Sequence, residues 1–230
     1  MGKVSQQAAA EFIATFTLIF IGAGSSILYA TKQVDLVGVA LAHGLALAIM
    51  VSVTAHISGG HVNPAVTAGL WVTGKIQTAR AGIYVGAQLL GAAVGAAALR
   101  WTFPAILWKP ANLGTPVPSP LINAGTAIVI EAILTFFLVF VVFGTAVDEH
   151  GPFAKLAGFP IGLVLTMDIL AAGPLTGAAM NPARSFGPAL ISGTWTDWWV
   201  YWIGPVSGGI IAAAIYWFTF LKDREPVLPD

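Results

Sequence analysis

The 230-residue chain contains no cysteine, and only 9% of its residues are charged. Without cysteine it cannot form disulfides, thiolate metal sites or a cysteine nucleophile. Its ten basic and ten acidic residues cancel and form no basic run, which argues against a nucleic-acid partner. Soluble domains carry about 25% charged residues, whereas 57% of this chain is hydrophobic. The composition therefore predicts an integral membrane protein.

Six apolar stretches are long enough to cross a bilayer, which takes about 20 residues. They are 8–30, 36–55, 79–103, 123–147, 156–173 and 198–221. The first stretch is too long for a signal-peptide core and lacks a convincing cleavage site, so we expect it to remain as a helix. Two shorter apolar segments, 63–73 and 181–192, would reach only about halfway across at about 1.5 Å per residue.

The two halves of the chain resemble each other. Asn-Pro-Ala occurs at 63–65 and again at 181–183, and "AEFIATF" at 10–16 resembles "IEAILTF" at 130–136. A unit of three spans must enter the membrane from opposite sides in its two copies, so we expect an inverted repeat. One channel domain of residues 1–230 is then predicted, with repeat one at about 8–103, a linker at about 104–122 and repeat two at about 123–221.

Inversion explains the two short segments, because they must dip into the membrane from opposite faces and meet near its midplane. Asparagine is a good N-cap, and proline suits the first helical position that follows. Irregular backbone at this depth is tolerated only where it is buried in protein or lines water. The runs before each box are therefore predicted to turn carbonyl oxygens toward a pore. The positive ends of the two half-helices would repel cations there.

The paired boxes, the run "HISGGHVNPAVT" at 56–67 and "NPARSFGPA" at 181–189 together resemble the aquaporin (major intrinsic protein) family over essentially the whole chain. The fold class implied is an all-α integral membrane protein with six transmembrane helices and two re-entrant half-helices. The resemblance also implies a passive water channel in a homotetramer, with one pore per subunit and neither cofactor nor metal.

The resemblance assigns roles to individual residues. The boxes would be Asn63, Pro64, Ala65, Asn181, Pro182 and Ala183, whose asparagines donate hydrogen bonds to the passing molecule. The pore carbonyls would be those of Gly59, Gly60, His61, Val62, Gly177, Ala178, Ala179 and Met180. Glu11 and Glu131 would brace the re-entrant loops by accepting their backbone N–H groups. The alternative is that these two carboxylates face the pore.

By the family's spacing, the selectivity filter consists of His43, Ile169, Ala178 and Arg184. Water-strict members usually carry phenylalanine and histidine at the first two positions. Histidine with isoleucine, together with "ILAAGP" at 169–174, is similar to plant tonoplast intrinsic proteins. This filter predicts passage of water and of small neutral solutes such as ammonia, urea or hydrogen peroxide. Ser185, directly after the arginine, resembles the water branch rather than the glycerol branch.

Two residues within the spans allow more than one interpretation. His43 is either a filter group or the partner in an interhelical hydrogen bond. A charged Asp168 costs free energy within a membrane span. It either braces the second re-entrant loop, or modifies the properties of His43 or of the outer mouth. A register shift of one residue would place Asp168 itself in the filter.

Other function classes have weaker support in the sequence. The chain shows no nucleophile–base set, metal cluster or phosphate loop, so we expect no enzyme. A coupled secondary transporter would need a titratable or ion-binding site at the midplane. A closed or structural member of the same fold remains an alternative. The short termini carry no organelle address, which favours the plasma membrane of a microbe, with a vacuolar-type membrane as the alternative.

Overall fold

The computed structural model describes residues 3–153 and 156–223, so the outermost residues of the expected 1–230 domain lie outside it. Six helices in the described chain are long and apolar enough to span a membrane. They are α1 (Val4–Ala30), α2 (Leu36–Ser58), α4 (Thr78–Thr102), α6 (Ala124–Val142) with its π-helical continuation η2 (Phe143–Val147), α7 (Gly158–Thr176), and α9 (Val200–Tyr216) with η3 (Trp217–Leu221). The predicted all-helical fold with six spans is confirmed.

Two short helices, α3 (Pro64–Val72) and α8 (Pro182–Ser192), begin at the Asn-Pro-Ala boxes. Asn63 caps α3 by accepting a hydrogen bond from the Ala65 N–H at 2.8 Å. Asn181 caps α8 by accepting one from the Ala183 N–H at 2.9 Å. Each cap satisfies an N–H that would otherwise lack a partner at the helix start.

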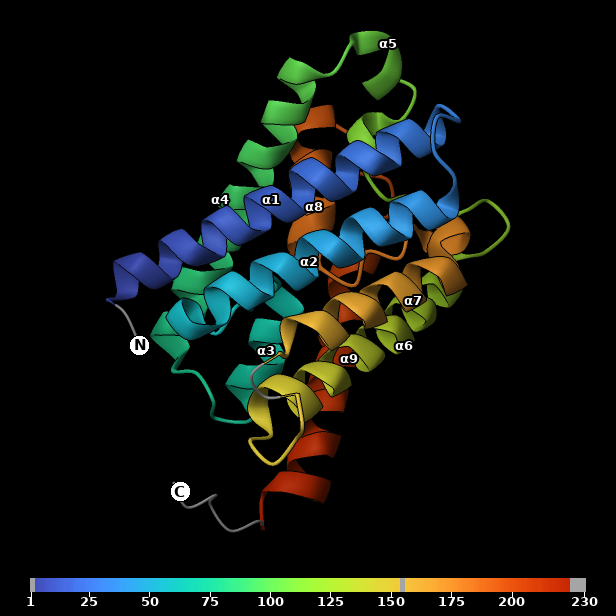
Figure 1. Ribbon diagram of the computed structural model, residues 1–230. Coiled ribbons are helices and arrows are strands. Elements are labelled where there is room, and N and C mark those ends of the chain that lie inside the picture. Colours follow the sequence, from blue (N-terminus) through green and yellow to red (C-terminus); the bar gives the residue numbers. More distant parts are fainter. Residues whose placement is uncertain (1–2, 154–155, 224–230) are drawn as a thin grey trace.

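The halves are interlocked rather than placed side by side. The short helix α3 of the first half packs against α9 of the second, while α8 of the second half packs against α4 of the first. Figure 1 shows both short helices among the long ones, with the start of α1 and the end of η3 toward one end of the bundle and α5 (Ala105–Trp108) toward the other. The space between the halves is therefore bounded by both short helices.

Glycines let the long helices approach closely where the two halves cross. A Cβ at Gly44 of α2 would overlap the Thr166 hydroxyl of α7 and lie 2.6 Å from the Gly162 carbonyl oxygen. The backbones of α2 and α7 thus touch at this point, as small residues allow between membrane helices. This crossing fixes the position of His43, the residue before Gly44.

The linker between the halves contains more structure than the loop predicted at 104–122. It holds α5 and the 3₁₀ turn η1 (Asn112–Gly114), whose residues Asn112, Leu113 and Gly114 have φ angles of 47°, 56° and 72°. Leu113 is fully buried, and η1 packs against both α1 and α8. The linker is thereby held against the helix that carries Arg184.

Candidate pore

A cavity of about 340 Å³ runs between the two halves. His43 of α2 and Arg184 of α8 line one end, the two box asparagines line its middle, and Lys75 and Glu149 line the other end, after α3 and η2. Most of its remaining wall is aliphatic, from α2, α6 and α7. The cavity is thus a mainly apolar passage with polar groups at a few positions.

The two asparagines exchange hydrogen bonds between the halves. The Asn63 amide donates to the Met180 carbonyl oxygen at 2.8 Å, and the Asn181 amide donates to the Val62 carbonyl oxygen at 3.0 Å. A side-chain amide carries two N–H donors and one carbonyl oxygen. Each oxygen already caps a half-helix, so one N–H on each asparagine is left over beside the cavity that both residues line.

The runs before the boxes have left-handed backbone at several positions. In the first run, φ is 94° at Gly59, 62° at Gly60 and 57° at Val62. In the second run, φ is 81°, 43° and 51° at the matching residues, which are Gly177, Ala178 and Met180. Of the eight carbonyls assigned to the pore, those of Val62 and Met180 already accept an asparagine N–H. The Val62 oxygen also accepts from the Thr15 hydroxyl at 3.5 Å, whereas the Met180 oxygen has a second lone pair beyond its bond to Asn63.

Glu11 and Glu131 are fully buried, and neither is among the described residues that line the cavity. Glu11 accepts hydrogen bonds from the backbone N–H groups of His61 and Val62 at 2.9 and 2.7 Å. Glu131 accepts the corresponding bonds from Ala179 and Met180, also at 2.9 and 2.7 Å. Each carboxylate thus compensates the cost of its own burial with charge-assisted bonds to a re-entrant loop.

Further bracing groups were not anticipated from the sequence. Ser58 and Thr176 each donate a hydroxyl to the nearby carboxylate at 2.7 Å. They are 118 residues apart, as are the two asparagines. This repeat offset is the sequence signal that could have identified them. Gln88 donates to Glu11 at 2.8 Å and to Thr67 at 3.1 Å. The matching position in the second half is a valine, so the repeat offers no signal for Gln88.

At the end of the cavity that His43 and Arg184 line, the Arg184 guanidinium is buried and held from two sides. One terminal nitrogen donates to the Gly114 carbonyl oxygen at 2.8 Å, and the other donates to the Ser26 hydroxyl at 3.1 Å. Its Nε has no partner within the described chain. Ser26 and Gly114 were not among the residues expected at the site, because they come from α1 and from the linker.

His43 bonds within its own helix, because its Nδ1 lies 3.0 Å from the Val39 carbonyl oxygen, one turn earlier on α2. A carbonyl can only accept, so Nδ1 carries the hydrogen and Nε2 is left as an acceptor. Nε2 is buried and has no partner in the described residues. The interhelical hydrogen bond considered for this histidine is therefore not what the structure shows.

The other two predicted filter residues and Asp168 are less exposed to the cavity. Ile169, Ala178 and Asp168 are all buried, and the described residues lining the cavity include none of them. Asp168 Oδ2 has no hydrogen-bond partner in the described chain. The second loop's N–H groups bond instead to Glu131 and Thr176, so no contact supports Asp168 as a brace. The assignment of Ile169 and Ala178 to the filter stays a prediction.

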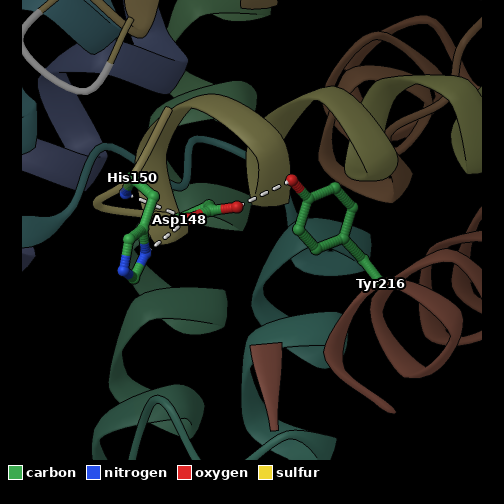
Figure 2. Close-up of polar contacts among 3 residues, drawn as sticks. All are labelled: Asp148, His150 and Tyr216. Carbon is green, nitrogen blue, oxygen red and sulfur yellow. Dashed lines mark hydrogen bonds and ion pairs between the residues drawn. The ribbon is translucent and has the colours of Figure 1, made fainter. Parts of the chain in front are cut away.

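The opposite mouth is held by a polar cluster beside the cavity. Asp148 accepts hydrogen bonds from the Tyr216 hydroxyl at 3.1 Å and from the His150 backbone N–H at 3.0 Å (Figure 2). The His150 ring nitrogen Nδ1 lies 3.2 Å from the same carboxylate. Lys75 lies 4.2 Å from the centre of the Trp217 ring. These contacts link the segment that follows η2 to the end of α9 beside the mouth.

Known proteins resemble the chain in sequence and in structure. Residues 2–216 match the family model described as major intrinsic protein. The chain is 45% identical to aquaporin TIP4-4 of Zea mays, over 96% of this chain and 90% of that protein. It is 44% identical to aquaporin TIP2-1 of Arabidopsis thaliana, over 95% and 88%.

Among solved structures, the aquaglyceroporin from Plasmodium falciparum is similar, with a TM-score of 0.85 and 29% identity over 93% of this chain and 96% of the other. Both of the sequence relatives named above are plant proteins. They give no support to the expected preference for a microbial plasma membrane.

Proposed function

Because the chain belongs to the major intrinsic protein family, whose aquaporins are channels rather than enzymes, we propose that it is a passive water channel that also conducts small neutral solutes and excludes ions and protons. The observation that carries the proposal is the exchanged pair of asparagine hydrogen bonds beside one continuous cavity. It leaves one N–H of Asn63 and one of Asn181 as donors to a molecule in transit.

A water molecule that accepts from both asparagines must direct its two hydrogens away from the midplane. Its oxygen then cannot accept a proton from a neighbouring water, which interrupts proton transfer along the file. The N-termini of α3 and α8 add positive potential at the same place, since unpaired N–H groups and the helix dipole favour negative charge there. The buried Arg184 adds a full positive charge at the filter and opposes cations, as pore arginines do.

The filter residues support solutes beyond water. His43 and Arg184 both line the cavity, so a neutral molecule that reaches this end passes beside an imidazole and a guanidinium. Ile169 would supply an apolar wall in place of a polar ring. Ammonia, urea and hydrogen peroxide are the solutes we propose.

The proposal extends to assembly and location. The family resemblance supports a homotetramer with a pore in every subunit. The plant origin and TIP names of the relatives support a vacuolar-type membrane for this multi-pass protein. A coupled transporter has less support, because the described residues that line the cavity between its two ends include no carboxylate. The titratable side chain among them, His61, is bonded to the Thr67 hydroxyl at 3.0 Å.

Stopped-flow light scattering of proteoliposomes after an osmotic jump tests the function. We expect fast shrinkage with a low activation energy, and ammonia flux above that of protein-free liposomes. Ammonia flux equal to the protein-free control would remove the solute part of the proposal. Water rates equal to that control would favour a closed or structural protein of the same fold.

Water permeability is expected to resist mercurial reagents, because these react with thiolates and the chain has no cysteine. Proteoliposomes treated with mercuric chloride should keep their shrinkage rate. A cysteine variant at a cavity-lining position, Val51→Cys, supplies the positive control. Strong inhibition of the unmodified protein that is reversed by a reductant would contradict this expectation.

A further inference from the structure

We infer that one turn of α1, from Gly22 to Ser26, sets the aperture of the filter by positioning both His43 and Arg184. The inference rests on the proposed channel function and adds positioning residues to it. These residues come from a helix that contributes no group to the filter predicted from the sequence.

The first contact places the imidazole. A Cβ built on Gly22 would lie 2.5 Å from His43 Cδ2 and 2.6 Å from Nε2, so the ring lies directly against the α1 backbone. Its other side is held because Nδ1 bonds to the Val39 carbonyl oxygen. Only glycine at position 22 permits this ring position. A methyl group there would move the ring toward the cavity that His43 lines.

The second contact places the guanidinium. The Ser26 hydroxyl lies 3.2 Å from the Gly22 carbonyl oxygen and accepts a bond from Arg184 at 3.1 Å. A hydroxyl has one hydrogen, and this one goes to Gly22, so the oxygen lone pairs face the arginine. Hydrogen bonds thus run in one direction, from Arg184 through Ser26 to Gly22.

The third contact places the other partner of the arginine. Gly114, whose carbonyl accepts from Arg184, lies against the same turn, because its own Cβ would be 2.5 Å from the Ala23 carbonyl oxygen. Both acceptors of the guanidinium are therefore positioned by α1. One short segment of α1 therefore determines the separation of His43 and Arg184 at their end of the cavity.

The test compares water and urea permeability of proteoliposomes for Gly22→Ala in two backgrounds. In the natural background we expect water permeability to fall about tenfold, the effect of about 1.4 kcal/mol on the barrier, and urea permeability to fall further. In a His43→Ala background, where no ring is displaced, Gly22→Ala should change either rate by less than about twofold. Gly82→Ala is the matched control, since its Cβ would meet nothing within 4 Å.

The second arm tests the guanidinium. Ser26→Ala should raise the urea-to-water permeability ratio about threefold, since Arg184 loses one of its two acceptors and a shift of this size needs well under 1.4 kcal/mol. Ser25→Ala is its control, because that hydroxyl also donates to the Gly22 carbonyl, at 2.7 Å, and has no bond to the arginine.

The outcomes separate the two proposals. Unmodified protein with the permeability of empty liposomes would refute the channel function itself. A conducting protein in which Gly22→Ala has no effect, or has equal effects in both backgrounds, would overturn the inference while leaving the channel in place. Equal ratios for Ser26→Ala and Ser25→Ala would overturn the role of Ser26. If the Gly22→Ala protein fails to fold, the Gly22→Ala/His43→Ala double variant is compared with His43→Ala. A folded double variant supports the inference, because removing the ring has relieved the clash. An unfolded double variant overturns it.

Discussion

Replacing Glu131 by glutamine is expected to lower water permeability to about a tenth or less of its normal value and to reduce thermal stability. One carboxylate oxygen accepts from Thr176 and Ala179, and the other accepts from Met180. Glutamine keeps only one acceptor and turns an NH₂ group toward a donor. A buried donor left unpaired costs about 1–3 kcal/mol, enough to explain a tenfold loss.

The effect should spread from the carboxylate to the midplane. Met180 has a φ of 51°, and its N–H bond to Glu131 holds that conformation. When the bond is lost, the Met180 carbonyl leaves its place opposite Asn63. Osmotic stopped-flow and thermal unfolding in detergent measure the two effects. The exposed carboxylate of Asp223 gives the matched control, Asp223→Asn. A Glu131→Gln protein with unchanged permeability and melting temperature would show that the brace is dispensable.

Gly44→Val is expected to prevent correct packing of α2 against α7. The added side chain would meet the Thr166 hydroxyl and the Gly162 backbone, and backbone cannot move aside as a flexible side chain can. Overpacking typically costs about 1–3 kcal/mol, and the contacts at Gly44 are with backbone as well as side chain. We expect little monodisperse protein in size-exclusion chromatography and a lower unfolding temperature for what remains.

The control for Gly44→Val is Gly82→Val, because position 82 is also helical but a Cβ there has no neighbour within 4 Å. Both variants place a β-branched residue in a helix, so the loss of helix propensity is common to the two. The difference between them reports on the crossing. Equal yield and equal melting temperatures would mean that the close approach at Gly44 contributes little to assembly.

The six spans and both half-helices could be predicted from the sequence because their signals are local. Apolar length marks a span, and Asn-Pro marks a helix start wherever it occurs. The ends were less certain. α1 begins at Val4 rather than at about residue 8, because the polar first turn is stabilised by Gln6, whose side chain accepts the Lys3 N–H at 2.8 Å. Hydropathy cannot detect a helix that extends into polar residues.

The backbone of the re-entrant loops could not be predicted. Val62 has a φ of 57°, which is unfavourable for a β-branched residue. Its N–H reaches Glu11, 51 residues earlier, at 2.7 Å. A strained conformation of this kind costs about 1–3 kcal/mol and persists only where the surrounding structure enforces it. The residues around Val62 in the sequence do not predict this conformation, because the partner that stabilises it, Glu11, lies on a different helix.

The contacts that hold Arg184 were missed for a related reason. The family resemblance predicts Arg184 as a filter residue but says nothing of its acceptors, which are Ser26 on α1 and Gly114 in the linker. The linker looked like a plain connection because it is rich in proline and has no long apolar run. Its function depends on a tertiary contact, the close approach of Gly114 to Ala23.

The exchanged asparagine bonds also constrain biogenesis. Asn63 donates to a carbonyl 117 residues later, and Asn181 donates to one 119 residues earlier. A ribosome that has delivered only the first three spans has therefore delivered an asparagine whose acceptor is not yet synthesised. The asparagine bonds at the centre of the channel therefore cannot form until the second half has been synthesised. A product truncated after the first half lacks half of the pore wall. It also lacks the Met180 carbonyl that would accept the Asn63 amide in the half that it retains.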